Sequence, residues 1–230
     1  MTPKKPTKPE LGRGSTQPPV LLLHGLARTK LSMAGLGRAL RRAGLRTLAH
    51  TYPSRQAGVV ALADAVAAWI VATHGDGEID LVTHSLGGVL ARHLSGRVAL
   101  RRVVMLAPPN AGSDLARALQ EFGPFGWLYG PAGRDVAEGK GWPDALAAEV
   151  GVIAGTRSPS LGNPTSWVSA PFFGDDRPND GTVAVDETHL PGMVDFATVD
   201  ASHTWIMNDP RVQAMVVRFL AEGRFAPTSK

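Results

Sequence analysis

The sequence predicts an α/β fold with a mainly parallel sheet of about six strands and helices on both faces. Short apolar runs, which are typical of strands buried on both sides, alternate along the chain with longer segments of helical spacing. Strands and helices that alternate in this way form a parallel sheet joined by right-handed crossovers. The length of 230 residues suits a single domain with one sizeable core.

The first half of the chain is expected to run strand, helix, strand, helix. The apolar run VLLL at residues 20–23 predicts the first strand, and apolar residues at helical spacing after Ser32 predict a helix ending near Gly44. A second strand is expected within residues 45–52. The amphipathic pattern of residues 59–74 then predicts a long helix.

The second half continues this alternation. A third strand at residues 79–83 leads directly into a helix within residues 84–96. Further strands are expected at residues 101–107, 150–155 and 193–199. Asp209 and Pro210 open a final helix, and Gly223 closes it.

The expected domain organisation has three parts. Residues 1–18 form a Pro- and Lys-rich leader that is expected to be disordered, residues 19–223 form a single domain, and residues 224–230 form a flexible tail. Within the domain, residues 109–149 are rich in glycine, proline and aromatic residues. We expect this segment to be a small cap-like insertion.

Composition and charge exclude several classes of protein. The absence of cysteine excludes disulfides, thiolate metal sites and cysteine catalysis. Of the formal net charge of +4, the leader carries +3, so the remainder is nearly neutral and no nucleic-acid partner is expected. No apolar run approaches the ~18 residues of a transmembrane segment, and the first 19 residues lack the apolar run of a secretory signal. We therefore expect a cytoplasmic protein, and the sequence carries no signal for an oligomeric state.

A serine stands where the third strand is expected to turn into a helix. The sequence there is Thr83-His84-Ser85-Leu86-Gly87, which predicts a nucleophile elbow with Ser85 as the nucleophile. Such a turn holds the serine in a strained conformation, so the residues two before and two after it must be small. Gly87 meets this demand, whereas Thr83 stands where glycine is usual.

The end of the first strand is expected to complete an oxyanion hole. Gly25 allows the chain to bend after His24, so that the next backbone N–H faces the site. The N–H groups of Leu26 and Leu86 are then the expected donors to the negative charge that develops on an attacked carbonyl. Losing one such donor typically raises the barrier by about 3 to 4 kcal/mol.

A serine hydroxyl needs a base, and histidine is the side chain best suited to that task near neutral pH. His203 follows the last strand and precedes the final helix, where a loop can carry it over the third strand, so it is the expected base. His189 is the second candidate. The other five histidines are expected in structural or exposed settings, and they are His24, His50, His74, His84 and His93.

A carboxylate is needed to fix the tautomer of the base. Asp180, in the sequence NDGTV, lies on a tight turn beyond the strand at residues 150–155 and gives the chain order serine, acid, histidine. The alternative is that Asp180 and Gly181 only form a turn. The competing carboxylates nearby are Asp175, Asp176, Asp186 and Asp195.

Together, HGLA, THSLGG, NDGTV and SHTWIM resemble the α/β-hydrolase superfamily over roughly residues 19–222. YPSR, APPNAGSD and GPAGRD are similar to small bacterial esterase or lipase-like proteins, including those near the GPI-inositol-deacylase-like hydrolases. The resemblance implies a Ser85, Asp180, His203 triad with acyl-enzyme chemistry, a small cap insertion and no cofactor. Secreted calcium-containing bacterial lipases carry an acidic residue shortly after the catalytic histidine; here Thr204 and Trp205 follow, so no metal is expected.

Aromatic residues in the insertion are expected to form part of the substrate site. Phe122, Phe125 and Trp127 are the residues expected to line an acyl pocket. The alternatives are packing for a long crossover and a mobile lid, and the lid is less favoured because no strongly amphipathic helix stands out. Ser113 and Asp114 are expected to cap a helix.

The leading hypothesis is a serine hydrolase that acts on carboxylic esters, with a small-molecule ester or a lipid as substrate. Thioesterases, acyltransferases and amidases use the same machinery, and the sequence does not separate them. The alternative from another class is a non-catalytic protein that uses this scaffold to bind a hydrophobic ligand. Retention of all three triad elements favours the enzyme.

Overall fold

The computed structural model describes residues 17–120, 123–158, 173 and 177–226, with only the backbone for residues 123–128. The strands in this part of the chain are β1 (Val20–Leu23), β2 (Thr47–His50), β3 (Ile79–His84), β4 (Leu100–Leu106), β5 (Glu149–Gly155) and β6 (Asp195–Val199). They form one six-stranded sheet in the order β2-β1-β3-β4-β5-β6, and all neighbouring strands are parallel. The predicted parallel sheet of about six strands is confirmed.

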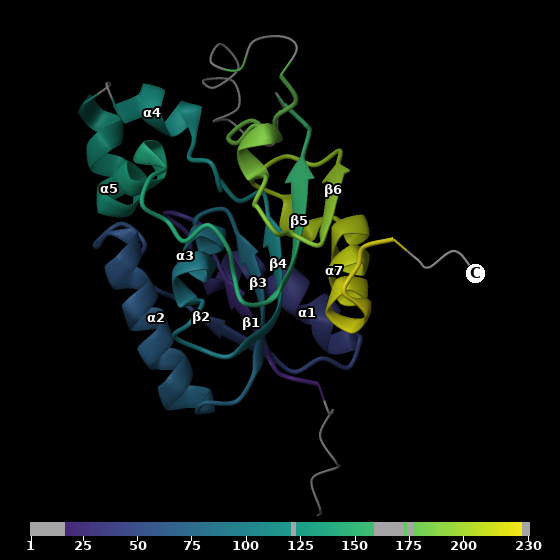
Figure 1. Ribbon diagram of the computed structural model, residues 1–230. Coiled ribbons are helices and arrows are strands. Elements are labelled where there is room, and N and C mark those ends of the chain that lie inside the picture. Colours follow the sequence, from purple (N-terminus) through teal and green to yellow (C-terminus); the bar gives the residue numbers. More distant parts are fainter. Residues whose placement is uncertain (1–16, 121–122, 159–172, 174–176, 227–230) are drawn as a thin grey trace, which may run out of the picture.

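Helices cover both faces of this sheet (Figure 1). The α-helices are α1 (Ala34–Arg42), α2 (Val59–His74), α3 (Leu86–Leu94), α4 (Asp114–Gln120), α5 (Gly123–Glu138) and α7 (Pro210–Glu222). The 3-10 helices are η1 (Lys30–Met33), η2 (Asp186–Thr188) and η3 (Ile206–Asn208). Among the helices that the structure describes, none combines the length and the apolar character needed to span a bilayer.

The strand side chains alternate between two apolar cores. In β1, Leu21 and Leu23 pack with α2 and α3, whereas Val20 and Leu22 pack with α1 and α7. The same alternation continues in β4. Because successive side chains of a strand point to opposite faces, a continuous apolar run serves both cores. This is the physical reason why VLLL predicts a strand of a doubly covered sheet.

Two element boundaries differ from the sequence-based prediction. The first helix does not begin at Ser32, because the side chain of Thr29 caps η1 and the regular α-helix starts only at Ala34. The last strand begins at Asp195 instead of Met193, because the N–H of Met193 closes a turn just before it. All the predicted helices and strands, these two included, lie within two residues of their expected bounds.

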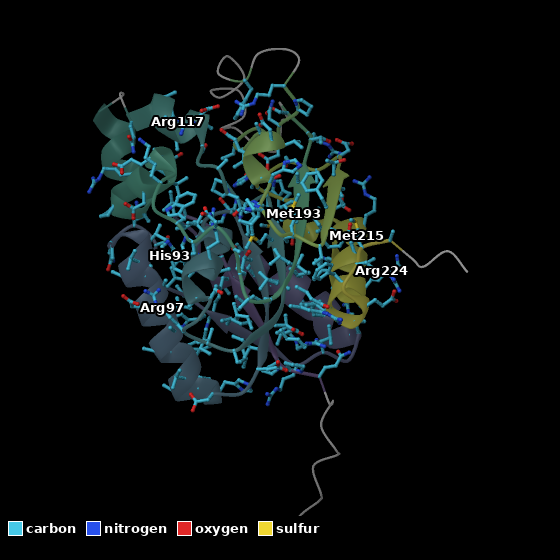
Figure 2. The ribbon with its side chains drawn as sticks, in the orientation of Figure 1. His93, Arg97, Arg117, Met193, Met215 and Arg224 are labelled. Carbon is cyan, nitrogen blue, oxygen red and sulfur yellow. The ribbon has the colours of Figure 1, made fainter. Side chains whose placement is uncertain are left out.

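The insertion at residues 109–149 contains α4 and α5, which lie at the end of the sheet to which the strands point (Figure 1). The guanidinium of Arg117, which Figure 2 labels on α4, donates to the carbonyl oxygen of Ala137 on α5 at 3.2 Å. Ser113 caps α4, since its Oγ accepts a hydrogen bond from the N–H of Ala116 at 3.2 Å. The predicted helix cap is confirmed.

The helix α5 is bent and anchored to the body of the domain. Gly130 has φ +64, and a Cβ there would overlap the backbone carbonyl of Arg55, so this close approach requires glycine. One turn later, Oδ2 of Asp135 accepts a hydrogen bond from the N–H of Val59 at 2.7 Å. Because Gly58 at the N-cap of α2 has no side chain, the carboxylate of α5 takes over the capping role.

The end of α3 is tied to α2 in a similar way. Arg97 donates to the carbonyl oxygen of His93 at 2.7 Å and forms an ion pair with Asp64 of α2 at 3.1 Å. Figure 2 shows His93 and Arg97 together beside α2. The two helices that cover this face of the sheet are therefore joined by polar contacts as well as by their apolar core.

The chain after α7 returns to the sheet. Gly223 ends α7 in the left-handed conformation, as predicted. Phe225 is buried against Phe219, with ring centroids 4.9 Å apart, and its N–H donates to Asp195 at 2.6 Å. The sequence places Phe225 in the expected C-terminal tail, and its side chain nevertheless belongs to the core.

We predict that Asp135→Ala lowers the free energy of unfolding by about 1 kcal/mol, because the first turn of α2 loses its cap. Urea unfolding followed by circular dichroism measures this change. Glu138→Ala on the same helix is the control, since Glu138 is exposed. Equal stability of the two variants would contradict a capping role for Asp135.

Candidate active site

Ser85 lies on a strained turn between β3 and α3. Its backbone has φ +52 and ψ −121, a conformation that residues with a side chain rarely adopt. A Cβ on Gly87 would lie only 2.9 Å from the carbonyl oxygen of Leu23, so glycine is required there, as the sequence predicts. Thr83 occupies the position where glycine is usual. Its side chain is buried, and its Oγ1 donates a hydrogen bond to the carbonyl oxygen of Val104 at 3.5 Å.

The loop after β1 packs directly against this turn. A Cβ on Gly25 would lie 2.8 Å from Nδ1 of His84 and 3.1 Å from Cβ of Ser85, so glycine permits the close approach of the two segments. In the described part of the chain, the N–H of Leu26 has no protein acceptor. Leu86 is the first residue of α3, where N–H groups lack an intrahelical partner. Both N–H groups are thus available to a ligand.

Residues of the YPSR segment hold the loop after β1. The hydroxyl of Tyr52 donates to the carbonyl oxygen of His24, and the two rings are stacked with centroids 4.1 Å apart. Oγ of Ser54 accepts a hydrogen bond from the N–H of Ala27 at 2.9 Å. Ala27 has φ +55, and this hydrogen bond stabilises the unusual conformation. The local sequence gives no sign of these two supporting roles.

Asp180 and His203 form a buried pair. Nδ1 of His203 lies 2.8 Å from Oδ2 of Asp180, and a backbone hydrogen bond of 3.0 Å joins the N–H of His203 to the carbonyl oxygen of Asp180. The second carboxylate oxygen accepts from the N–H groups of Thr182 at 3.0 Å and Val183 at 2.8 Å. With Nδ1 as the donor to the carboxylate, Nε2 of His203 is the nitrogen free to accept a proton.

His84 holds His203 from the other side. Its ring is completely buried, and its Nε2 lies 2.9 Å from the carbonyl oxygen of His203. Burial lowers the pKa of His84 well below its usual value, and repulsion from His203 and Arg28 lowers it further. The ring is therefore neutral at pH 7, and its Nε2–H donates a hydrogen bond to the carbonyl oxygen of His203. The sequence suggests only a structural setting for His84 and misses this contact.

The competing candidates lie elsewhere. His189 is exposed and stacks on Phe196 with ring centroids 4.3 Å apart. Asp186 is exposed and pairs with Arg177 at 2.9 Å, while Asp195 accepts hydrogen bonds from backbone N–H groups near β6. Two further candidates, Asp175 and Asp176, lie outside the described residues.

Ser85 and His203 line one cavity of about 320 Å³, together with Leu26 and Leu86. The cap contributes an apolar wall to the same cavity, formed by Leu115, Ala116, Leu119 and Val136. Of the three aromatic residues expected in this wall, Phe122 and the side chains of Phe125 and Trp127 lie outside the described residues. Among the described residues, no group of three or more His, Asp or Glu side chains is arranged to hold a metal ion.

Comparison with known proteins gives the family. A family model described as "Alpha/beta hydrolase family" matches residues 20–227. The chain belongs to the alpha/beta hydrolase family. The resemblance and the fold expected from the sequence are thereby confirmed. A search of curated proteins gave no significant match for this hydrolase.

Solved structures of esterases and lipases share the fold of this alpha/beta hydrolase. The mature form of the Bacillus licheniformis lipase BlEst2 is 19% identical, with a TM-score of 0.72 over 93% of this chain and 95% of that chain. An esterase from Thermogutta terrifontis is 17% identical, with a TM-score of 0.59 over 92% of each chain. The metagenomic carboxyl esterase MGS0156 is 19% identical, with a TM-score of 0.58 over 94% of this chain and 75% of that chain.

The burial of neutral His84 predicts a pH dependence of stability for this hydrolase. Below pH ~6.5 the unfolded chain takes up a proton at His84 that the folded chain does not, so acid favours unfolding. His84→Gln removes this contribution, and the free energy of unfolding should then fall less steeply between pH 6.5 and 5, by up to about 1.4 kcal/mol per pH unit. Urea unfolding of both proteins at several pH values measures the difference. Parallel curves would show that His84 titrates in the folded protein.

Proposed function

We propose that this alpha/beta hydrolase is a serine hydrolase that cleaves carboxylic esters through an acyl-enzyme on Ser85. The observation that supports this most strongly is the strained turn of Ser85 in the wall of a cavity that His203, paired with Asp180, also lines. A nucleophile, its base and the partner of the base belong to one site in acyl-transfer enzymes.

Each residue has a defined role in the proposed reaction. Oγ of Ser85 attacks the ester carbonyl while Nε2 of His203 takes the hydroxyl proton. Asp180 holds the imidazole in the required tautomer and stabilises the imidazolium that forms. The N–H groups of Leu26 and Leu86 then stabilise the oxyanion of the tetrahedral intermediate.

The same groups complete the reaction in reverse roles. His203 returns its proton to the leaving alcohol, which departs and leaves the acyl group on Ser85. His203 next takes a proton from a water molecule, which attacks the acyl-enzyme and releases the carboxylic acid. The apolar wall of Leu115, Leu119 and Val136 suits an acyl chain, and Phe122, Phe125 and Trp127 are proposed to extend it.

A fluorophosphonate probe tests the nucleophile, because it reacts covalently with an activated serine. We expect labelling of the wild-type protein and none of Ser85→Ala, which should also lose hydrolysis of p-nitrophenyl esters from acetate to palmitate. Ser32→Ala is the control, since Ser32 is a half-buried serine on η1 that does not line the cavity. Absence of labelling in folded wild-type protein would instead favour a non-catalytic binding protein.

The carboxylate assignment is tested by comparing two aspartates of one loop. Asp180→Asn should reduce kcat/KM by about three to four orders of magnitude, because the amide favours the wrong tautomer of His203. Asp186→Asn should change kcat/KM less than about threefold, because Asp186 is exposed and pairs with Arg177. Similar losses in both variants would argue against Asp180 as the partner of the base.

A further inference from the structure

The cavity beside Ser85 carries positive charge that the proposed reaction does not use. Among the described residues that line it, the permanently charged side chains are Arg28 and Arg134, and none is acidic. Arg28 is half-buried in the loop after β1, and Arg134 is exposed on α5. The remaining lining of the cavity is mainly apolar.

Arg28 lacks the carboxylate partner that several partly buried arginines of the described chain have. Arg92 and Arg218 also donate only to backbone carbonyl oxygens, but neither of them lines this cavity. Arg101, Arg102 and Arg177 each form an ion pair with a carboxylate, at 2.5, 2.6 and 2.7 Å. Arg28 forms none within the described part of the chain, and its one protein hydrogen bond runs from Nη1 to the carbonyl oxygen of Thr204 at 3.2 Å. Burial lowers the pKa of Arg28.

A half-buried guanidinium without a carboxylate is an unfavourable arrangement for the protein alone. The guanidinium has five N–H donors in a planar fork, and only one of them is occupied by a protein acceptor in the described residues. The others are free to bind a carboxylate or a phosphate in the two-pronged manner that such anions favour. Among the described residues none supplies a carboxylate to Arg28, so its free N–H groups can bind an anion that enters the cavity.

The contact with Thr204 locates Arg28 relative to the reaction. Thr204 directly follows His203, which returns its proton to the leaving alcohol in the proposed reaction. Apolar residues of α4 and α5 line the same cavity, and they suit an acyl chain. Arg28 is thus joined by a hydrogen bond to the loop of the residue that protonates the leaving alcohol in the proposed reaction.

We propose that the substrates of this hydrolase are esters whose alcohol portion carries an anionic group, and that Arg28 binds this group. The proposal rests on the proposed ester hydrolysis at Ser85 and names its substrate class. Arg134 at the rim of the cavity adds to the positive potential that attracts such esters.

Three matched esters test the proposal. 3-Carboxyphenyl hexanoate has its charge on the alcohol, 3-carbamoylphenyl hexanoate is neutral, and 3-carbamoylphenyl hydrogen adipate has its charge at the end of the acyl chain. The quantity to measure is kcat/KM for each ester, by chromatography of the released phenol. We expect the first ester to be preferred over the neutral one by about tenfold or more, since hydrogen bonds to charged groups have that effect.

Variants of Arg28 then assign the preference to this side chain. In Arg28→Gln the ratio of kcat/KM for the anionic-alcohol ester to that for the neutral ester should fall about tenfold to hundredfold. Arg28→Lys should retain more of the ratio, because it keeps the charge and loses only the planar fork. Arg42→Gln is the matched control, since Arg42 is exposed on α1 and does not line the cavity, and its ratio should equal that of the wild type.

The outcomes separate the two proposals. Equal kcat/KM for the three esters, a ratio that Arg28→Gln leaves unchanged, or a preference for the adipate ester would each overturn the assignment to an anionic alcohol. Each of these results still requires an active ester hydrolase. Failure of the proposed function is a different result, in which none of the three esters is hydrolysed and the fluorophosphonate probe does not label Ser85.

Discussion

The candidate site depends on the close approach of the end of β1 to the turn that follows β3. Ser85 has a positive φ, and α3 begins directly after it, close to the carbonyl group of Leu23 at the end of β1, where Gly87 has no room for a side chain. The carbonyl oxygen of His24 lies under Gly87 and also accepts the hydroxyl hydrogen of Tyr52. One short stretch of backbone therefore fixes the turn of the serine and the loop that offers the N–H of Leu26.

His84 joins the loop of His203 to the turn that carries Ser85. Because His84 immediately precedes Ser85, its hydrogen bond to the carbonyl oxygen of His203 links the strained turn to a segment 119 residues further along the chain. Burial keeps the imidazole of His84 neutral. It therefore donates a hydrogen bond to the backbone of His203 without placing a positive charge next to that residue. One buried side chain thus holds the backbone of His203 in place and adds no charge beside it.

Local patterns in the sequence predict the parts of the site that local structure determines. Ser85 and Gly87 stand at fixed offsets around a turn, and in a parallel sheet the carboxyl ends of the strands meet, so His203 is expected near them. The tight turn of NDGTV beyond the strand at residues 150–155 favours Asp180, although all five candidate carboxylates share the chain order serine, acid, histidine. The roles of His84 and Ser54 come from contacts between distant segments, for which no spacing rule exists. Such contacts become visible only when the fold is known.

In the insertion at residues 109–149, local sequence determines the bend of α5, whereas contacts with distant segments determine where the insertion lies. Glycine and proline hide the helical pattern of residues 109–149, yet Gly130 allows the bend and the following Pro131 suits the first turn of a new helical segment. The position of the cap depends on charges from other segments. Arg177, close to Asp180 in sequence, pairs with Asp114 at the start of α4 at 2.7 Å, so the loop that carries Asp180 and the wall of the cavity are held together.

The positive character of the cavity results from where the carboxylates lie and not from the total charge. The leader carries +3 of the formal net charge of +4, so the folded part has nearly as many acids as bases. The buried carboxylates of the described residues have other partners: Asp80 pairs with Arg101 at the start of β3, Asp180 pairs with His203, and Glu187 accepts hydrogen bonds from backbone N–H groups. Arg28 has no carboxylate partner among the described residues, and it lines the same cavity as Ser85 and His203. A positive potential at this position favours both an anionic substrate and the negative charge that develops on an attacked carbonyl, so binding and catalysis would draw on the same unbalanced charge.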